Sequence, residues 1–222
     1  MDFNNIIQTL AVYALPVIFA ITIHEAAHGY VAQRLGDPTA AMLGRVTLNP
    51  LKHIDPIGTI LMPVALLLLT KGAFVFGYAK PVPVRFDQLR HPKRDMISVA
   101  AAGPVSNLIQ ALLWGMLLVV LVGLETQERF FVAMAQAGVL VNVLLAVFNL
   151  FPVPPLDGGR VLVGLLPTRA AIAVSRIEPY GFFIVVALVL AGVLSTLWIM
   201  PLTELTLALL NLLVAPLKAL FS

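Results

Sequence analysis

The chain alternates between long apolar stretches and short polar connections. Four apolar stretches are long enough to cross a hydrocarbon core of about 30 Å as helices, and they cover residues 6–35, 96–124, 130–151 and 180–200. A fifth stretch, 202–220, reaches spanning length only through Pro216, and a sixth, 57–69, is shorter and leads into a glycine-rich segment. The pattern predicts an all-α polytopic membrane protein with five to six transmembrane helices.

Composition supports this class and excludes others. Hydrophobic residues make up 60% of the 222 positions and charged residues only 11%, whereas soluble domains are about 25% charged. The first apolar stretch lacks a basic n-region and a small-residue cleavage site, so we do not expect a removable signal peptide. Cysteine is absent, so any metal must be held by His, Asp or Glu. The net charge of +3 does not indicate a nucleic-acid partner.

Two polar connections are expected to be extended rather than helical. Residues 44–48 have the alternation of a short strand, and residues 77–84 contain prolines that push the preceding residues out of the helical region. Non-helical backbone near a membrane is tolerated only where protein or a water-filled cavity satisfies it. Two such segments on either side of one helical stretch therefore indicate a cavity.

The basic residues predict an orientation. If residues 57–78 re-enter the side from which they came, one side of the membrane holds twelve of the 14 Lys and Arg residues, the other holds Arg129, and Lys71 lies near the tip. The twelve are Arg34, Arg45, Lys52, Lys80, Arg85, Arg90, Lys93, Arg94, Arg160, Arg169, Arg176 and Lys218. A full crossing by residues 57–69 gives a weaker bias of ten to four. The positive-inside rule thus favours a re-entrant segment, an outside N-terminus and cytoplasmic motif-bearing loops.

The pentapeptide HEAAH, residues 24–28, carries the first candidate chemistry. His24 and His28 are one helical turn apart and project from one face, which is the spacing at which two imidazoles bind one Zn²⁺ at about 2.0–2.1 Å. Glu25 is close enough to reach a water on that metal and act as general base. A solvated helix face is the ordinary alternative, but an apolar membrane helix offers no solvent.

Asp157 is the main candidate for a third ligand. It follows the apolar stretch 130–151 after three prolines, and Gly158-Gly159 lets the chain turn before a further helix to Leu166. Asp157 could equally cap that helix. Asp55 is the competing carboxylate, although it too suits a helix cap before Pro56, and His53 suits a surface loop better than a metal site. Counting crossings places Asp157 on the same side as the two histidines.

Three motifs together resemble the site-2 protease family of intramembrane zinc metalloproteases, in its compact bacterial form without a PDZ or CBS domain. They are HEAAH, "AAGPVSN" (101–107) and "NLFPVPPLDGG" (149–159), and the resemblance covers about residues 6–166. It implies one zinc ion on His24, His28 and Asp157, with Glu25 as catalytic base. It also implies substrate binding by Asn149 and Pro155 and, from the helix beside the site, by Asn107. Residues 44–48 and 77–84 resemble the family's membrane re-entrant β element, which offers an edge to the substrate.

The resemblance further implies an integral protein of a bacterial or archaeal cell membrane. Its partners would be the lipid bilayer and single-pass transmembrane proteins or peptides, cleaved in regulated intramembrane proteolysis or in clearance of signal-peptide remnants. The identity of the substrate and the oligomeric state stay open. We expect a membrane-embedded metalloprotease core over residues 1–179 and a C-terminal helix pair, 180–222, that acts as scaffold or gate.

The alternative function is a zinc-binding membrane regulator or a metal transporter without protease activity. Transport requires ligands along a path between the two faces, whereas the candidate ligands here converge on one site. A third class, the HExxH proteases of prenylated proteins, takes its last ligand from a Glu at membrane depth. The available glutamates, Glu125, Glu128, Glu178 and Glu204, all lie in loops or at predicted helix ends.

Overall fold

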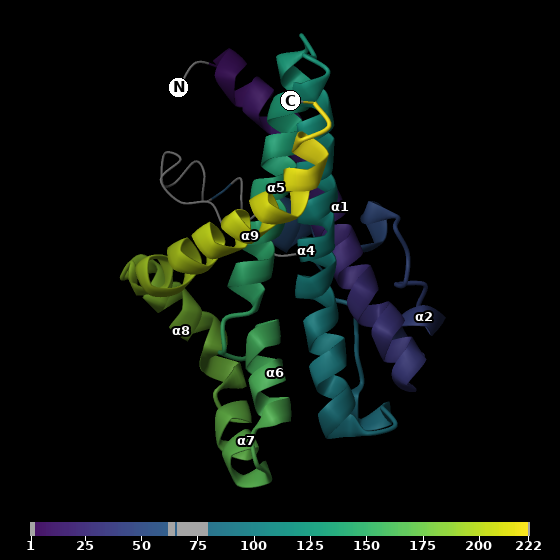
Figure 1. Cartoon of the computed structure of the whole chain (residues 1–222). Coiled ribbons are helices and arrows are strands. Elements are labelled where there is room, and N and C mark those ends of the chain that lie inside the picture. Colours follow the sequence, from purple (N-terminus) through teal and green to yellow (C-terminus); the bar gives the residue numbers. More distant parts are fainter. Residues whose placement is uncertain (1–2, 62–64, 66–79, 222) are drawn as a thin grey trace.

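The fold is built from long helices, described by a computed structural model over residues 3–61, 65 and 80–221 (Figure 1). The first five helical elements are α1 (Phe3–Leu35), α2 (Thr39–Met42), η1 (Pro50–Lys52), η2 (Pro56–Leu61) and η3 (Phe86–Gln88). They are followed by α4 (Pro92–Gly123), α5 (Arg129–Asn149), α6 (Asp157–Leu165), α7 (Thr168–Ser175), α8 (Glu178–Leu190), η4 (Ser195–Ile199) and α9 (Met200–Lys218). The described part of the chain contains no strand, which agrees with the all-α prediction.

Four helices of the described residues are long and apolar enough to cross a membrane, and five if the bent pair α7–α8 counts as one span. They are Ile7–Leu35, Pro92–Gly123, Arg129–Asn149 and Ser195–Lys218. Large apolar side chains such as Leu113, Phe183 and Leu212 are exposed on them, as expected for surfaces that face lipid. The chain is therefore an integral membrane protein. The re-entrant excursion predicted for 57–78 lies mostly outside the described residues, apart from η2 and residue 65.

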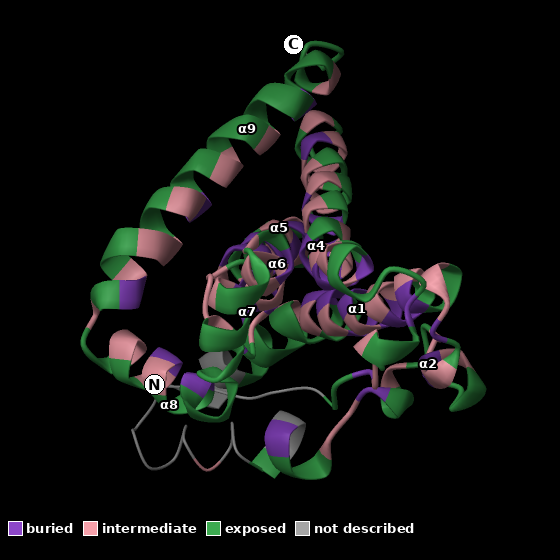
Figure 2. Ribbon diagram, turned by 90° about the horizontal axis from the view of Figure 1, so that it is seen from below, coloured by how far each residue is buried: buried purple, intermediate pink, exposed green. Residues whose placement is uncertain are grey.

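The core forms where α1, α4 and α5 meet, and Figure 2 shows buried positions concentrated there. Small residues allow this close approach: Ala20, Ala111, Ala135 and Ala146 are fully buried. A second cluster joins Val143 and Val147 of α5 to residues of the C-terminal segment, including Trp198. Trp198 also donates a hydrogen bond from Nε1 to the carbonyl oxygen of Val147 at 2.8 Å. The C-terminal helices thus pack on the helices that carry the predicted site.

The predicted helix over residues 180–200 is wrong, because this stretch is broken. α8 ends at Leu190, Gly192 has a φ of +72°, and a π-helical turn leads into α9. α9 then returns to the end of the bundle where α4 finishes: Lys218 and Gly123 line one crevice there, and both chain termini lie at this end (Figure 1). Lys218 therefore lies on the side of Arg129, and the predicted count of twelve to one becomes eleven to two.

The predicted short strand over residues 44–48 is also not formed; these residues make turns and bends. Residues 80–85 are irregular, with Arg85 in an extended conformation, while residues 77–79 lie outside the described part. Asp55 behaves as a cap, since its Oδ1 accepts hydrogen bonds from the backbone of Ile57 and Gly58 at 3.0 and 2.7 Å. His53 is not on the surface but buried, with Nε2 bonded to the carbonyl of Thr47 at 3.0 Å.

Asp37 connects the end of α1 to the segment before α4. α1 ends as predicted at Leu35, followed by Gly36 with a φ of +118°. The buried carboxylate of Asp37 accepts hydrogen bonds from the backbone of Thr39 at 3.0 Å and of Arg85 at 2.6 Å. Burial alone would raise the pKa of Asp37, but these hydrogen bonds lower it below its ordinary value of 3.8.

We expect Asp37→Asn to lower the free energy of unfolding by about 1–3 kcal/mol, because two hydrogen bonds to a charged acceptor are weakened. Since the folded-state pKa is depressed, the ionised group stabilises the fold fully above pH 3.8 and loses this effect as pH falls through the folded value. The difference in unfolding temperature between the two proteins in detergent should therefore be largest at pH 7 and should shrink as the pH falls below 3.8. Asp87→Asn, at an exposed carboxylate of the same segment, is the control. Equal unfolding temperatures at pH 7 would contradict this role.

Candidate metal centre and active site

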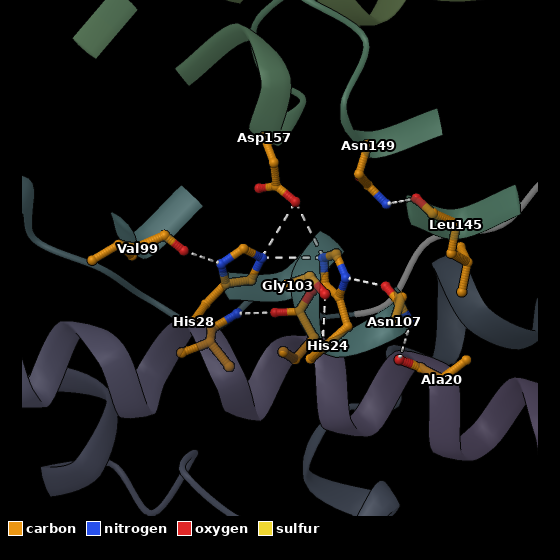
Figure 3. A network of polar contacts seen from close by, with 12 residues as sticks. Ala20, His24, His28, Val99, Gly103, Asn107, Leu145, Asn149 and Asp157 are labelled. Carbon is orange, nitrogen blue, oxygen red and sulfur yellow. Dashed lines mark hydrogen bonds and ion pairs between the residues drawn. The ribbon is translucent and has the colours of Figure 1, made fainter. Parts of the chain in front are cut away.

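The structure brings together the three predicted ligands from two elements (Figure 3). His24 and His28 project from the inner face of α1, and Asp157 is the first residue of α6. Their facing atoms form a triangle: His24 Nε2 lies 3.1 Å from His28 Nε2, and Asp157 Oδ2 lies 3.3 and 3.4 Å from these two nitrogens. His24 and Asp157 are buried and His28 is partly so. Three residues that are 133 positions apart at the extremes thus converge on one point.

The outer nitrogen of each imidazole is already engaged. His28 Nδ1 lies 2.7 Å from the carbonyl oxygen of Val99, and His24 Nδ1 lies 2.6 Å from Oδ1 of Asn107. A carbonyl oxygen only accepts, so both Nδ1 atoms carry the hydrogen in neutral imidazoles. Both Nε2 atoms then present lone pairs to each other and to Asp157. This is the tautomer that a metal requires.

Asn107 is held in one orientation by further buried groups. Its Nδ2 donates to the carbonyl of Ala20 at 3.1 Å and to Oδ1 of Asn142 at 2.9 Å. Asn142 is fixed in turn, because its Nδ2 donates to the carbonyl of Gly138 at 2.9 Å. Both asparagines are fully buried. The chain of hydrogen bonds leaves Oδ1 of Asn107 facing His24, so it sets the tautomer of that ligand.

A tetrahedral zinc ion fits this arrangement. With bonds of about 2.0–2.1 Å, such an ion separates its ligand atoms by about 3.3–3.4 Å, close to the three distances in the triangle. Asp157 Oδ2 is buried and has no hydrogen-bond partner among the described residues. Without a cation, the lone pairs of the two nitrogens and of the carboxylate oxygen repel one another at these distances. A bound cation would remove this repulsion. Three protein ligands leave a fourth position open, as in catalytic zinc sites.

Asp157 does not cap its helix. The N-cap position of α6 is Leu156, and no side chain supplies a capping hydrogen bond there. Gly158 and Gly159 allow this placement because the helix start is pressed against the preceding loop. A Cβ on Gly158 would meet the backbone of Leu150, and one on Gly159 would lie 2.6 Å from Pro154 Cδ. The two glycines therefore let the carboxylate approach α1.

Gly103 of α4 lies directly against the two imidazoles. A Cβ at this position would lie 2.6 Å from His24 Nε2 and closer still to His28 Nε2. The sequence pattern did not single out this residue, because a glycine inside an apolar helix has many possible roles. Val99, whose carbonyl orients His28, was missed for a similar reason: a main-chain acceptor leaves no mark in the side-chain pattern.

Glu25 lies beside the ligand triangle rather than in it. It is partly exposed, and its Oε2 accepts a hydrogen bond from the backbone N–H of Val82 at 2.6 Å. The group of possible metal ligands contains His24, His28 and Asp157 but not Glu25. Glu25 is therefore not one of the side chains that could hold the metal.

The three predicted substrate-binding residues lie in different surroundings. Pro155 is exposed at the end of the loop before α6, and Asn149 is partly exposed at the last turn of α5. The Nδ2 atom of Asn149 donates to the carbonyl of Leu145 at 2.9 Å (Figure 3). Asn107, in contrast, is fully buried and bonded to three protein groups. The geometry of Asn107 therefore favours orientation of His24 over contact with a substrate.

We expect Asn107→Leu to weaken zinc retention about 10- to 100-fold, the usual cost of losing a group that orients a metal ligand. The measurement is zinc bound per chain after dialysis against graded chelator. Gln110→Leu is the matched control, because Gln110 is a buried amide one turn further along α4 whose side-chain atoms have no partner within the described structure. If both variants hold zinc as the wild type does, Asn107 does not orient His24.

Comparison with known proteins gives the family. A family profile described as Peptidase family M50 matches residues 124–192. "Putative zinc metalloprotease YwhC" of Bacillus subtilis is 40% identical over 179 residues, which cover 78% of this chain and 78% of YwhC. The chain belongs to peptidase family M50. "Putative zinc metalloprotease Rip2" of Mycolicibacterium smegmatis is 30% identical over 184 residues, which cover 80% of this chain and 66% of that relative. No solved structure matches the chain.

Membership of family M50 confirms the resemblance to site-2 proteases that the three motifs indicated. This M50 peptidase is a zinc metalloprotease and thus a hydrolase, as its relatives' names state and its metal-binding cluster supports. Its M50 relatives differ in length: "Putative zinc metalloprotease Rip3" of Mycobacterium tuberculosis is 27% identical over 197 residues, which cover 84% of this chain but 42% of Rip3.

Proposed function

We propose that this protein hydrolyses peptide bonds within or next to the transmembrane segments of single-pass membrane proteins, with one zinc ion on His24, His28 and Asp157. The observation that carries the proposal is the depth of the ligand triangle within a membrane span. Leu35 ends the span, and His28 and His24 lie seven and eleven residues before it. At 1.5 Å per residue these side chains are about 10 and 16 Å inside the helix end, where only a substrate that enters the membrane can meet them.

The proposed chemistry assigns each step to a residue. When bound, zinc lowers the pKa of a coordinated water and polarises the peptide carbonyl. Glu25 accepts a proton at its carboxylate as the water attacks and returns it to the leaving amine nitrogen. His24 and His28 contribute fixed lone pairs, because Asn107 and the carbonyl of Val99 hold their Nδ1–H groups.

Cleavage requires an extended substrate, because a helical peptide bond is shielded by its own hydrogen bonds. We place the substrate between the end of α5 and the loop before α6, in contact with Asn149 and Pro155. Asn149 is suited to this because the described hydrogen bonds engage only its amide nitrogen, which leaves its carbonyl oxygen able to accept from a substrate N–H. An edge of residues 77–84 that pairs with the substrate stays a prediction, since part of that segment lies outside the described residues.

We further propose that the site opens toward the cytoplasm and that the protein resides in a bacterial cell membrane. Eleven of the 14 Lys and Arg residues lie in the loops, short helices and helix ends on the side of the bundle that carries α2, η3 and α7, once Lys218 is counted at the opposite end. Positive residues accumulate on the cytoplasmic side. The N-terminus and C-terminus, which share the opposite end (Figure 1), would then face outward.

We also propose that residues 1–179 form the catalytic core and that residues 180–222 act as scaffold. α8 packs on the loop before Asp157: a Cβ on Gly181 would lie 2.7 Å from Pro155 Cδ and closer to the carbonyl of Pro154. Such contact supports the loop from which Asp157 emerges. Scaffold and gate are distinguishable, because a scaffold is needed for zinc retention and a gate only for substrate entry.

The test is cleavage of single-pass membrane reporters by the purified protein in detergent. We expect cleavage that a zinc chelator abolishes and added zinc restores, with the cut mapped by mass spectrometry inside or beside the apolar segment. A reporter with the same soluble parts but no apolar segment is the matched control and should stay intact. Cleavage of both reporters alike would contradict the intramembrane function, and chelator-resistant cleavage would contradict the role of zinc.

A further inference from the structure

Arg45 is a buried cation with an unusual set of partners. Its side chain is only 8% exposed, and its Nη2 lies 2.8 Å from the carbonyl oxygen of Lys80 and 3.4 Å from that of Pro81. No carboxylate lies within ion-pair distance in the described residues, and Nε has no partner there. Burial of a charge without an ion-pair partner costs free energy. The two main-chain carbonyls that the guanidinium binds therefore indicate that the position of their segment is important.

That segment, Lys80–Val82, is fixed from several sides. The backbone N–H of Lys80 donates to the carbonyl of His53 at 3.0 Å. Val82 is buried, and Gly29 of α1 lets it sit directly on the helix, since a Cβ on Gly29 would lie 3.1 Å from Val82 Cγ1. Pro81 and Pro83 have no N–H, so the N–H of Val82 is the only main-chain donor between Lys80 and Val84.

That single donor is directed at Glu25, whose Oε2 it meets at 2.6 Å. The terminal torsion of a glutamate side chain has a broad, shallow preference, so an isolated carboxylate rotates freely. A hydrogen bond to one oxygen restrains this rotation and so narrows the directions in which the other oxygen, Oε1, can point. The base is thereby oriented before a substrate arrives.

We infer that Arg45 is a positioning residue for the catalytic base. It acts through the backbone. The guanidinium donates hydrogen bonds to the carbonyls of Lys80 and Pro81, and the planar peptide unit between Pro81 and Val82 fixes the direction of the Val82 N–H. This N–H donates to Oε2 of Glu25. The inference rests on the proposed role of Glu25 as general base. Because misplacement of a catalytic group by about 1 Å costs up to about 100-fold in rate, loss of Arg45 should reduce kcat while KM and the metal are unaffected.

The test compares four single variants of Arg45 and Val82, one double variant and one surface control with wild type on one cleaved reporter, with kcat, KM and zinc per chain measured for each. Arg45→Met keeps the aliphatic stem and removes every donor, and Arg45→Lys restores a single cationic donor. Val82→Pro removes the N–H, whereas Val82→Ala keeps it and removes most of the side chain. Arg85→Met is the matched surface control, because Arg85 is exposed and its side chain forms a surface ion pair with Asp87.

We expect Arg45→Met to lower kcat about 10- to 100-fold, with KM within about twofold of wild type and zinc content unchanged. Arg45→Lys should recover part of the loss. Val82→Pro should match Arg45→Met, Val82→Ala should lose clearly less, and the double variant Arg45→Met/Val82→Pro should be no worse than either single one. Arg85→Met should resemble wild type.

Several results would overturn the inference. An unchanged or increased kcat in Arg45→Met would exclude a positioning role. An increase would indicate that the segment Lys80–Val82, as Arg45 holds it, inhibits cleavage. Loss of zinc or a rise in KM in Arg45→Met would assign Arg45 to the fold or to substrate binding. Failure of the proposed function is a separate outcome: in that case wild type and Glu25→Gln are indistinguishable, whereas failure of the inference alone leaves them different.

Discussion

Glu25→Gln is expected to abolish cleavage while zinc stays bound. The amide has nearly the shape of the carboxylate and still offers an oxygen to the N–H of Val82, but it cannot accept a proton from water. General-base catalysis contributes about 10²–10⁴-fold to rate, so the variant should be slower by at least that range. Zinc should remain at the wild-type level, since the ligand triangle consists of His24, His28 and Asp157.

The measurement combines the initial rate of reporter cleavage with zinc per chain by mass spectrometry. Glu128→Gln is the matched control, because this exposed glutamate lies in the loop between α4 and α5, at the opposite end of the bundle from α6. Cleavage at the wild-type rate in Glu25→Gln would mean that another group acts as base. Loss of zinc from the same variant would mean that Glu25 helps to hold the metal, contrary to the geometry of the site.

The sequence predicts those parts of the site in which ionisable side chains lie within or beside apolar stretches. His24, Glu25 and His28 are evident because ionisable groups inside an apolar helix require a partner. Asp157 is a candidate because few acidic residues lie near membrane level, and counting crossings supports it by placing it on the same side of the membrane as the histidines. The structure brings His24, His28 and Asp157 into one group that could hold a metal ion, and it finds Asp55 in the capping role that was its alternative.

The parts that the sequence does not predict depend on contacts between main-chain groups or on missing side chains. The carbonyl of Val99, the N–H of Val82 and the empty space at Gly103 leave no recognisable pattern in the chain. The same holds for larger features. The apolar stretch through Gly192 predicts one helix, because hydropathy does not depend on a φ of +72°. The break between α8 and α9 at this point changes the side of the membrane on which Lys218 lies.

The orientation of the histidines shows why buried amides are tolerated in this core. Asn107 and Asn142 are hydrogen-bonded to each other and to the carbonyls of Ala20 and Gly138, so the amide nitrogen of each side chain has a partner. An interior Asn on a membrane helix is often a contact between helices, and these two are also that. Their second effect is that Asn142 of α5 orients Asn107, and Asn107 sets the tautomer of His24. The packing of α5 on α4 therefore affects metal binding.

Gly103→Ala is expected to remove zinc and cleavage together, in contrast to Glu25→Gln. The added Cβ would lie 2.6 Å from His24 Nε2 and closer to His28 Nε2, well inside van der Waals contact and at the atoms that face the metal. Neither imidazole can retreat, because Asn107 and Val99 hold their Nδ1 atoms at 2.6 and 2.7 Å. α4 must therefore move away from α1 or the ligand triangle must open, and either change separates the ligand atoms.

We expect zinc per chain to fall at least about 10-fold under chelator competition, the lower end of the effect of disturbing a metal ligand's surroundings, and cleavage to fall with it. Gly115→Ala on the same helix is the matched control: a Cβ there meets Val214 Cγ1 at an ordinary 3.7 Å, and alanine favours a helix over glycine by about 1 kcal/mol. This control should keep its zinc and unfold at the same or a higher temperature. If Gly103→Ala binds zinc as tightly as Gly115→Ala, then α4 yields freely at the site, and the close approach of Gly103 is not what shapes the metal centre.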